Sequence, residues 1–422
     1  MRIRIRALAH GGAGVGRPDT DGPTWFVEGA LPGEVVEADA EHTAQRYVRG
    51  RLREVIEASG DRVTPPCPLA DRCGGCDWQH VAVDRQTEHK RQVVADQLRA
   101  VVPDGSQVRL GGSVGADGPY RRRARLHYEQ TPEGVRIGFY ARRSREVVDT
   151  PDCPVLVEPI RRAVARLRQV AHVLPESGEL LAVADGAQVV VGLPGVRADA
   201  GVREALQAQI GGELIGVGLR GGRKATTIGR AHIELDAHDG LAPTLTSAFV
   251  FAQANAGQNR ALVMHVARAA RPDGRRVLEL FCGNGNFTRA LAKSARRVWA
   301  VDDDREAIEL LRKTATAHHL PVNAKKASAP NLIQRIAKGG TRYESVVLDP
   351  PRKGLGASAS KALAEVATER IVYVSCDPAT LARDLKVILA GGWAIDEVRV
   401  FDMMPMTSQI ETVVTLSPRR IK

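Results

Sequence analysis

The pattern of apolar and polar positions divides the 422-residue chain into three stretches. Residues 1–58 alternate apolar and polar positions in short runs such as RIRIRALA and TWFVEGAL, separated by Gly, Pro and Asp turns, which predicts a small antiparallel β-barrel. After residue 250, apolar runs such as RRVLELF alternate with amphipathic runs such as EAIELLRKTA, which is typical of a doubly wound parallel α/β domain. We therefore expect a barrel at 1–58, a central α+β domain at 59–250 and an α/β domain at 251–422.

The charge of the chain points to a polyanionic partner. Sixty Lys and Arg against 49 Asp and Glu give a net charge of +11. The most basic window is Tyr120–Arg145, with eight arginines and two glutamates. From this window we take as candidate contacts to a phosphate backbone Arg121, Arg122, Arg123, Arg125, Arg142 and Arg143.

The chain carries no membrane or export signal. It has no run of 18 apolar residues, and its N-terminus MRIRIRALAHGGAG lacks the apolar core of a signal peptide. We expect a cytoplasmic protein that does not bind membranes.

Four of the six cysteines have a spacing that predicts a metal site. Cys67, Cys73 and Cys76 lie in the segment CPLADRCGGCDWQH, and Cys153 follows far downstream. Four thiolates suit either zinc or an iron–sulfur cluster. Two C-x2-C pairs would favour zinc, whereas three clustered ligands and a remote one favour [4Fe–4S], so we prefer the cluster. Its expected role is structural, because Cys153 would tie the arginine-rich region to this loop.

A glycine-rich turn after the first α/β strand predicts a cofactor crevice. In VLELFCGNGNF, Gly283 and Gly285 allow a ligand to approach the backbone closely. The next strand, VWAVD, ends in Asp302, whose carboxylate can accept hydrogen bonds from both ribose hydroxyls of an adenosine. NAD and S-adenosylmethionine both satisfy this pattern. Thr288 stands where a dinucleotide fingerprint has its third glycine, which favours S-adenosylmethionine.

Two later strands also end in chemically active residues. The run SVVLDPPRKG ends its strand at Asp349, and IVYVSCDPATLARDL ends its strand at Cys376. Ligands of open parallel sheets bind outside the carboxyl ends of the strands. We therefore expect one crevice to collect Phe281, Asp302, Asp349 and Cys376.

Cys376 has two interpretations. A lone cysteine after β-branched residues is often a buried packing residue. Here Asp377 and Pro378 end the strand and start a helix, which favours an accessible thiol with thiolate character. A thiolate that adds to C6 of a uracil makes C5 nucleophilic, and a base must later remove the C5 proton. The run SQIETVVTL offers Glu411 as that base, whereas Cys282, inside the glycine turn, is interpreted as a packing residue.

These motifs together resemble the bacterial RNA 5-methyluridine methyltransferases, most closely the branch with an N-terminal TRAM domain and an iron–sulfur cluster. The similarity covers nearly the whole chain. It rests on CPLADRCGGCDWQH, YRRRARL, DTPDCPV, FAQANAGQN, LFCGNGNF, DPPRKG, VSCDPATLARD and IETVV, in that order.

The resemblance implies a role for each matching residue. It implies Cys376 as the nucleophile, Glu411 as the base and Asp349 as the residue that orients the uracil, with the cluster on the four cysteines. It implies donor contacts, besides the glycine turn, from Gln253, Phe281, Asn286, Asp302 and Asp349, and another near Ser328, where the match in KKASAPN is poor. Relatives typically have histidine before the Val/Ile-Glu pair, and this chain has Gln409.

Three other functions fit the sequence less well. A cytosine C5-methyltransferase would carry a second cysteine in the loop DPPRKG, and an exocyclic-amine methyltransferase would need an aromatic residue where Arg352 stands. A non-catalytic RNA-binding protein would not need Cys376, Glu411 and Asp349 together. We expect a monomeric enzyme that makes 5-methyluridine in RNA with S-adenosylmethionine, acting on 23S rRNA, with position 54 of tRNA as the alternative.

Overall fold

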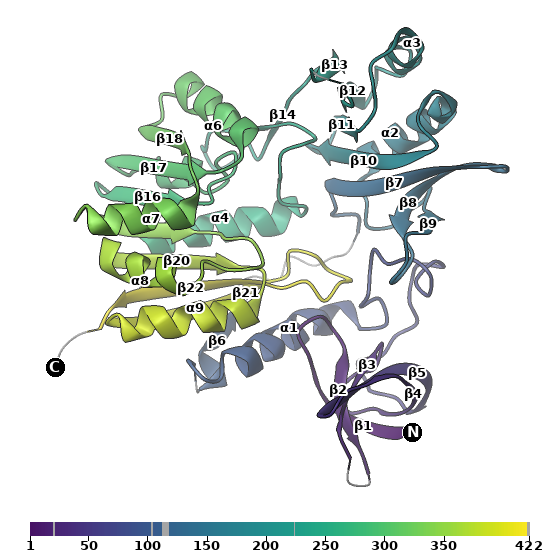
Figure 1. The fold of residues 1–422 in the computed structure, drawn as a ribbon, viewed down its shortest axis with the longest axis horizontal. Coiled ribbons are helices and arrows are strands. Elements are labelled where there is room, and N and C mark those ends of the chain that lie inside the picture. Colours follow the sequence, from purple (N-terminus) through teal and green to yellow (C-terminus); the bar gives the residue numbers. More distant parts are fainter. Residues whose placement is uncertain (20–21, 103, 112–117, 223, 420–422) are drawn as a thin grey trace.

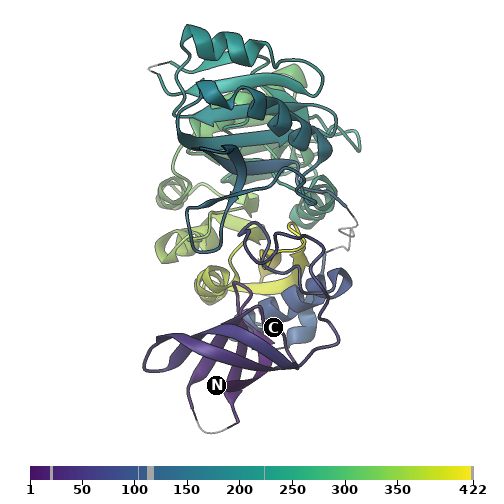
Figure 2. The ribbon, with the colours of Figure 1, turned by 90° about the vertical axis from the view of Figure 1, so that its right-hand side faces the viewer.

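The structure is a computed structural model that describes residues 1–19, 22–102, 104–111, 118–222 and 224–419. Three bodies make up the molecule. The α/β domain lies at the left of Figure 1, the central domain at the upper right and the N-terminal barrel at the bottom. Figure 2 shows the barrel and the central domain at opposite ends of the molecule.

The N-terminal strands form a closed barrel in the order β1-β2-β3-β5-β4, which confirms the predicted fold of this stretch. Alternate residues of β1 point inward, so that Ile3 and Ile5 pack against Trp25 and Val27 in the barrel core. The strands are β1 (Arg2–Leu8), β2 (Gly14–Pro18), β3 (Thr24–Glu28), β4 (Val35–Thr43) and β5 (Tyr47–Glu57).

The central domain is a seven-stranded sheet in the order β13-β12-β11-β10-β7-β8-β9. Helix α2 (Glu158–Gln169) buries Ile160, Val164 and Leu167 against it, and α3 (Ala200–Gln207) packs near β13. The strands are β7 (Arg123–Thr131), β8 (Gly134–Tyr140), β9 (Val147–Asp149), β10 (Ser177–Ala184), β11 (Val189–Pro194), β12 (Leu214–Arg220) and β13 (Thr226–Gly229). A two-stranded ribbon, β14 (Ile233–Leu235) and β15 (Thr244–Thr246), leads on to the α/β domain.

The α/β domain is built on an eight-stranded sheet in the order β18-β17-β16-β19-β20-β22-β21-β6. Strands β16 to β20 run parallel, and β22 runs antiparallel to β20 and β21. The strand order reverses between β16 and β19, the place where open α/β sheets bind ligands. The strands are β16 (Arg276–Leu280), β17 (Arg297–Asp302), β18 (Val322–Lys326), β19 (Tyr343–Leu348), β20 (Ala367–Ser375), β21 (Trp393–Phe401) and β22 (Glu411–Pro418).

Helices cover both faces of this sheet (Figure 1). They are α4 (Ala256–Ala270), α5 (Thr288–Leu291), α6 (Arg305–Ala317), α7 (Ala329–Lys338), α8 (Ala357–Val366) and α9 (Pro378–Ala390). No helix in the described ranges is both long and apolar enough to span a membrane.

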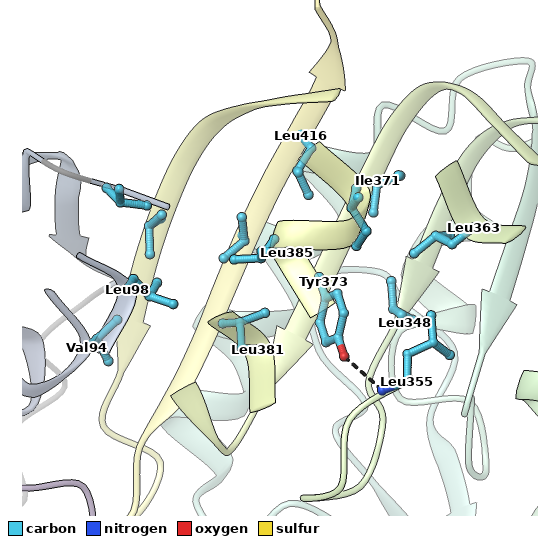
Figure 3. Close-up of a cluster of buried hydrophobic side chains, with 14 of the residues drawn as sticks. Val94, Leu98, Leu348, Leu355, Leu363, Ile371, Tyr373, Leu381, Leu385 and Leu416 are labelled. Atoms are coloured by element: carbon cyan, nitrogen blue, oxygen red, sulfur yellow. Dashed lines mark hydrogen bonds between the residues drawn. The ribbon is translucent and has the colours of Figure 1, made fainter. Parts of the chain in front are cut away.

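One part of the expected central domain belongs instead to the α/β domain. Helix α1 (Val83–Leu98) puts Val94 and Leu98 into the same buried cluster as Leu381 and Leu385 of α9 (Figure 3). Strand β6 (Val108–Leu110) then extends the sheet beyond β21. The boundary expected at residue 250 therefore does not enclose the whole α/β domain, because α1 and β6, from an earlier part of the chain, complete its core and its sheet.

Candidate active site

The carboxyl ends of the parallel strands meet as the sequence predicts. Strands β16, β17, β19 and β20 are paired in parallel register, so the residues that end or directly follow them lie at one edge of the sheet. Strand β22 runs the other way and starts at this edge, because its Thr412 pairs with Ser375. This edge therefore collects Phe281, Asp302, Asp349, Cys376 and Glu411.

The Cys376 thiol is protonated at neutral pH. Burial, together with the charges of Glu411 and Asp349, raises the pKa of Cys376 to about 12, although Arg352 acts to lower it. The expected thiolate character is therefore wrong for the free enzyme. The N-terminus of α9 is already occupied by Asp377, whose Oδ1 accepts hydrogen bonds from the amides of Ala379 and Thr380 at 3.0 and 2.9 Å. A base must remove the thiol proton before attack.

A buried carboxyl, Glu411, and a half-buried one, Asp349, stand beside this thiol. Burial and the charge of Asp349 raise the pKa of Glu411 well above its usual range. Burial and the charge of Asp302 raise the pKa of Asp349 to about 7. Within the described residues, Oε1 of Glu411 is buried without a hydrogen-bond partner. Asp349 is therefore suited to exchange protons near neutral pH, and Glu411 is a stronger base than an ordinary glutamate.

Glu279 is a third carboxyl, which the sequence reasoning missed. Burial first, and the charges of Asp349 and Asp302 as well, raise the pKa of Glu279 to about 8. Thr288 donates a hydrogen bond to its Oε2 at 2.5 Å. The signal in the sequence was an acidic residue inside the apolar strand VLELF, where both faces are buried.

The glycine turn is shaped by close contacts. The Gly283 amide donates to Asp302 Oδ2 at 2.8 Å. Gly285 has a φ of +97°, and a Cβ there would lie 2.5 Å from Cδ1 of Leu311. Phe281 also adopts a left-handed φ, +61°, which is uncommon for a bulky side chain. The turn therefore requires glycine at position 285.

A narrow cavity of about 50 Å³ lies over this turn. Its lining includes five of the predicted donor contacts, namely Gln253, Phe281, Gly283, Asn286 and Asp349. Asp302 borders it through its bond to Gly283. Gly285 instead faces Leu311, and Ser328 is exposed at the start of α7, outside the lining. The residues of the turn fit an adenosyl ligand, since a strand-end carboxylate and a glycine turn that a ligand can approach closely are the features that hold one.

Arg122 does not lie on the predicted basic surface. It is 5% exposed, and its guanidinium donates to Asp236 at 2.6 and 2.8 Å and to the Gln253 carbonyl at 3.0 Å. Asp236 also accepts from Asn259, which exchanges two hydrogen bonds with Asn286. The predicted RNA contact at Arg122 is corrected: this arginine joins the central domain to the donor cavity.

The other five arginines reach the surface in different ways. Arg121 stacks over Phe139 and Arg123 over Phe251, with 5.0 and 5.1 Å from guanidinium carbon to ring centroid. Arg142 braces the loop of residues 67–80, the cysteine loop, by donating to two of its carbonyls at 3.1 Å. Arg143 forms ion pairs with two barrel carboxylates, and Arg125 is exposed.

A groove of about 610 Å³ leads to the active site. Barrel, cysteine loop, central sheet and α/β domain all contribute to its walls, which include Arg121, Arg142, Arg143 and Arg352. His127 and Tyr140 stack in its wall with centroids 3.6 Å apart. Arg352 donates to Gln409 at 2.6 Å. A basic, aromatic groove of this kind suits an unpaired RNA strand.

The four predicted metal ligands line one cavity of about 270 Å³. Cys73, Cys76 and Cys153 are buried and Cys67 is half-buried. Burial, and then mutual proximity, raises the pKa of Cys73, Cys76 and Cys153, that of Cys76 to about 12. Within the described chain, no three Cys, His, Asp or Glu side chains converge on a single ion position. A cavity lined by four cysteines suits a multi-atom cluster or a single zinc ion.

Comparison with known proteins decides the family. Residues 245–419 match the family model described as tRNA (Uracil-5-)-methyltransferase, and residues 1–52 match the TRAM domain. The chain is 35% identical to 23S rRNA (uracil(1939)-C(5))-methyltransferase RlmD of Halomonas elongata, over 98% of this chain and 88% of that protein. The protein of the same name from Pseudomonas putida is 33% identical, over 98% and 92%. The chain belongs to the RNA uracil-C5-methyltransferase family.

This RNA uracil-C5-methyltransferase shares its fold with a solved structure. The Pyrococcus abyssi tRNA (uracil-54, C5)-methyltransferase, solved with S-adenosyl-L-homocysteine, superposes with a TM-score of 0.76 at 24% identity, covering 99% of this chain and all of the other. Membership of the family confirms the expected activity, methylation of uracil C5 in RNA with S-adenosylmethionine, and excludes the NAD alternative.

Proposed function

We propose that this enzyme makes 5-methyluridine in 23S rRNA, with Cys376 as nucleophile, Glu411 as the base that removes the C5 proton and Asp349 as the group that orients the uracil. The observation that carries the proposal is the meeting of a thiol and two carboxyls at the strand edge beside the glycine turn. The 23S rRNA substrate is supported by full-length relatives with that activity in their names.

The first chemical step requires a proton acceptor beside the thiol. Asp349, with a pKa of about 7, takes the Cys376 proton as sulfur bonds to C6 of the uracil. The C5–C6 double bond breaks, and its electrons move to C5 and O4. Arg352 favours the thiolate, because its positive charge lowers the pKa of Cys376. The step thus needs no preformed thiolate.

The second step uses the other carboxyl. Gln253, the glycine turn and Asp302 would hold S-adenosylmethionine, which would supply the methyl group to C5 and be left as S-adenosylhomocysteine. Glu411 then accepts the C5 proton, the C5–C6 double bond forms again, and Cys376 leaves C6 as a thiolate. Because Glu411 is only 7% exposed, water does not compete for the intermediate.

The groove offers a path for the RNA strand. A flipped uridine enters past Arg352, and the flanking phosphates follow the groove arginines Arg121, Arg142 and Arg143, while Arg123 and Arg125 extend the basic surface along β7. Exposed Phe251, under Arg123, offers a stacking surface beside the donor cavity.

We also propose a [4Fe–4S] cluster on Cys67, Cys73, Cys76 and Cys153, in preference to zinc. Its support is the shared 270 Å³ cavity, together with the spacing of three clustered ligands and one remote ligand in the sequence. Bound there, the cluster would fix the cysteine loop against β8, to which Cys73 is bridged through Ala141. Iron and sulfide analysis of protein purified without oxygen should give four of each per chain; one zinc per chain would overturn this assignment.

The substrate assignment is tested by offering both RNAs. Purified enzyme, labelled S-adenosylmethionine and unmodified transcripts of 23S rRNA or tRNA should yield 5-methyluridine in 23S rRNA alone. RNA from a strain lacking the gene should lack 5-methyluridine at one 23S position and keep it at tRNA position 54. Label in tRNA alone would assign the enzyme to the other substrate.

A further inference from the structure

The segment of residues 402–410 joins β21 to β22 and ends directly before Glu411. It forms the yellow loop beyond the ends of β21 and β22 in Figure 1. Four regions outside the C-terminal half of the chain contact it or its neighbours: the barrel turn, the cysteine loop, α1 and the start of the central domain. The position of the proposed base therefore depends on residues far from it in the sequence.

The first half of the segment is fixed by a buried ion pair. Lys90 of α1, fully buried, donates to Asp402 Oδ1 at 2.6 Å and to the Met404 carbonyl at 3.1 Å. The Tyr120 hydroxyl donates to the Pro405 carbonyl at 2.8 Å. Buried charge pairs of this kind resist rearrangement, because separating them exposes an unpaired charge.

The second half is held by the cysteine loop. The Trp78 amide donates to the Met406 carbonyl at 3.0 Å, and Gln86 accepts from the Met406 amide at 2.7 Å. Met406 adopts a left-handed φ of +65°, so these contacts hold a conformation that the residue rarely adopts alone. The Ser408 amide donates to Asp77 Oδ1 at 2.8 Å.

We infer that Asp77 is a positioning residue for the catalytic base. It follows Cys76 directly, and its carboxylate holds the backbone three residues before Glu411. Between them, Gln409 accepts from Arg352, so the same stretch also sets the arginine beside the nucleophile. Asp77 thereby links the cysteine loop to proton removal from C5. This inference rests on the proposed role of Glu411.

The test separates proton removal from binding. Asp77→Ala removes the acceptor, and Asp77→Asn keeps an oxygen in its place. Asp71→Ala is the matched control, because Asp71 is an exposed acid of the same loop that forms no hydrogen bond or ion pair with the described residues. For each full-length variant, kcat, KM for a 23S fragment, donor affinity and the fraction of enzyme covalently joined to unmodified RNA are measured. Glu411→Gln serves as the reference for lost base function.

We expect Asp77→Ala to lower kcat about tenfold or more, with KM and donor affinity within twofold. Covalent enzyme–RNA adduct should accumulate, because C5 proton removal becomes slow. Asp77→Asn and Asp71→Ala should behave like the unsubstituted enzyme. If Asp77→Ala does not fold, Asp77→Ser, whose shorter side chain falls away from the Ser408 amide, takes its place.

The other possible outcomes show which of the proposed roles is wrong. Adduct in Glu411→Gln but not in Asp77→Ala, or an equal loss in Asp77→Asn and Asp77→Ala, would overturn the positioning role alone. No adduct in Glu411→Gln would remove Glu411 as the base, and the inference with it. A raised KM with unchanged kcat would make Asp77 an RNA-binding residue instead.

Discussion

Replacing Arg122 with alanine should destabilise the protein rather than release RNA. The change leaves the Asp236 carboxylate, whose side chain is 4% exposed, without its bidentate partner. Breaking a buried pair costs about 3–5 kcal/mol. Arg289, 3.9 Å from Asp236, remains as a second cation. The expected loss of stability therefore lies near the lower end of this range, at about 3 kcal/mol. For a cooperative unit of about 150–250 residues, a loss of about 3 kcal/mol in the free energy of unfolding lowers the Tm by about 6–12 °C.

Arg125 provides the matched control, because its side chain is 60% exposed and its ion pair with Glu179 spans 3.7 Å. Arg125→Ala should change the free energy of unfolding by less than about 0.5 kcal/mol. It should weaken RNA binding and reduce the slope of log affinity against log salt by about 0.7. Thermal unfolding and RNA titrations at several salt concentrations measure both. If the Arg122→Ala protein is as stable as the unsubstituted enzyme but binds RNA more weakly, the assignment of Arg122 to a buried ion pair is refuted.

The same pair predicts a dependence of stability on pH. Burial acts to raise the pKa of Asp236, but the hydrogen bonds and charge of Arg122 outweigh it and lower the pKa. The stabilisation is therefore complete above the ordinary value, about 3.9, and is lost as the pH falls through the lowered one. Arg122→Ala should lack this component, so its stability should fall less on acidification.

Two further changes test the glycine turn and its buried acid. Gly283→Ala, which has open space around its Cβ, should cost about 1–2 kcal/mol of stability from its positive φ, whereas Gly285→Ala should cost more, because its Cβ would also meet Leu311. Denaturant unfolding of the two variants measures the difference, and equal losses of stability would contradict this. Glu279, with a pKa raised to about 8, binds one more proton folded than unfolded from about pH 4 to 8, so stability falls as the pH rises through that window. Glu279→Gln should lack this fall when denaturant unfolding is compared at pH 5 and 8, and an unchanged fall would show that Glu279 is not its source.

The sequence predicted the strand-end chemistry well because parallel topology alone brings it together. Once Asp349 and Cys376 are placed at the ends of parallel strands, no further contact is needed to bring them to one edge. The barrel could be predicted equally well, since its alternation of apolar and polar residues is a local pattern. The four cysteines share a cavity as their spacing suggested.

Features that depend on distant partners could not be predicted. Whether an arginine in RRRAR faces RNA or a buried aspartate is decided by Asp236, more than a hundred residues away. The thiolate expected at Cys376 failed because carboxyls from two other strands and burial outweigh the helix N-terminus. Strand β6 pairs with β21 across about two thirds of the sequence, and no local pattern predicts this pairing.

Covalent trapping tests the central claim most directly. RNA carrying 5-fluorouracil at the target position cannot lose a C5 proton after methyl transfer, so the bond from Cys376 to C6 should persist. With S-adenosylmethionine present, the enzyme should form a denaturation-resistant adduct with this RNA, and Cys376→Ala should form none while binding donor and RNA normally. An adduct that survives in Cys376→Ala, or no adduct with the unsubstituted enzyme on an RNA that it methylates, would contradict attack by this thiol.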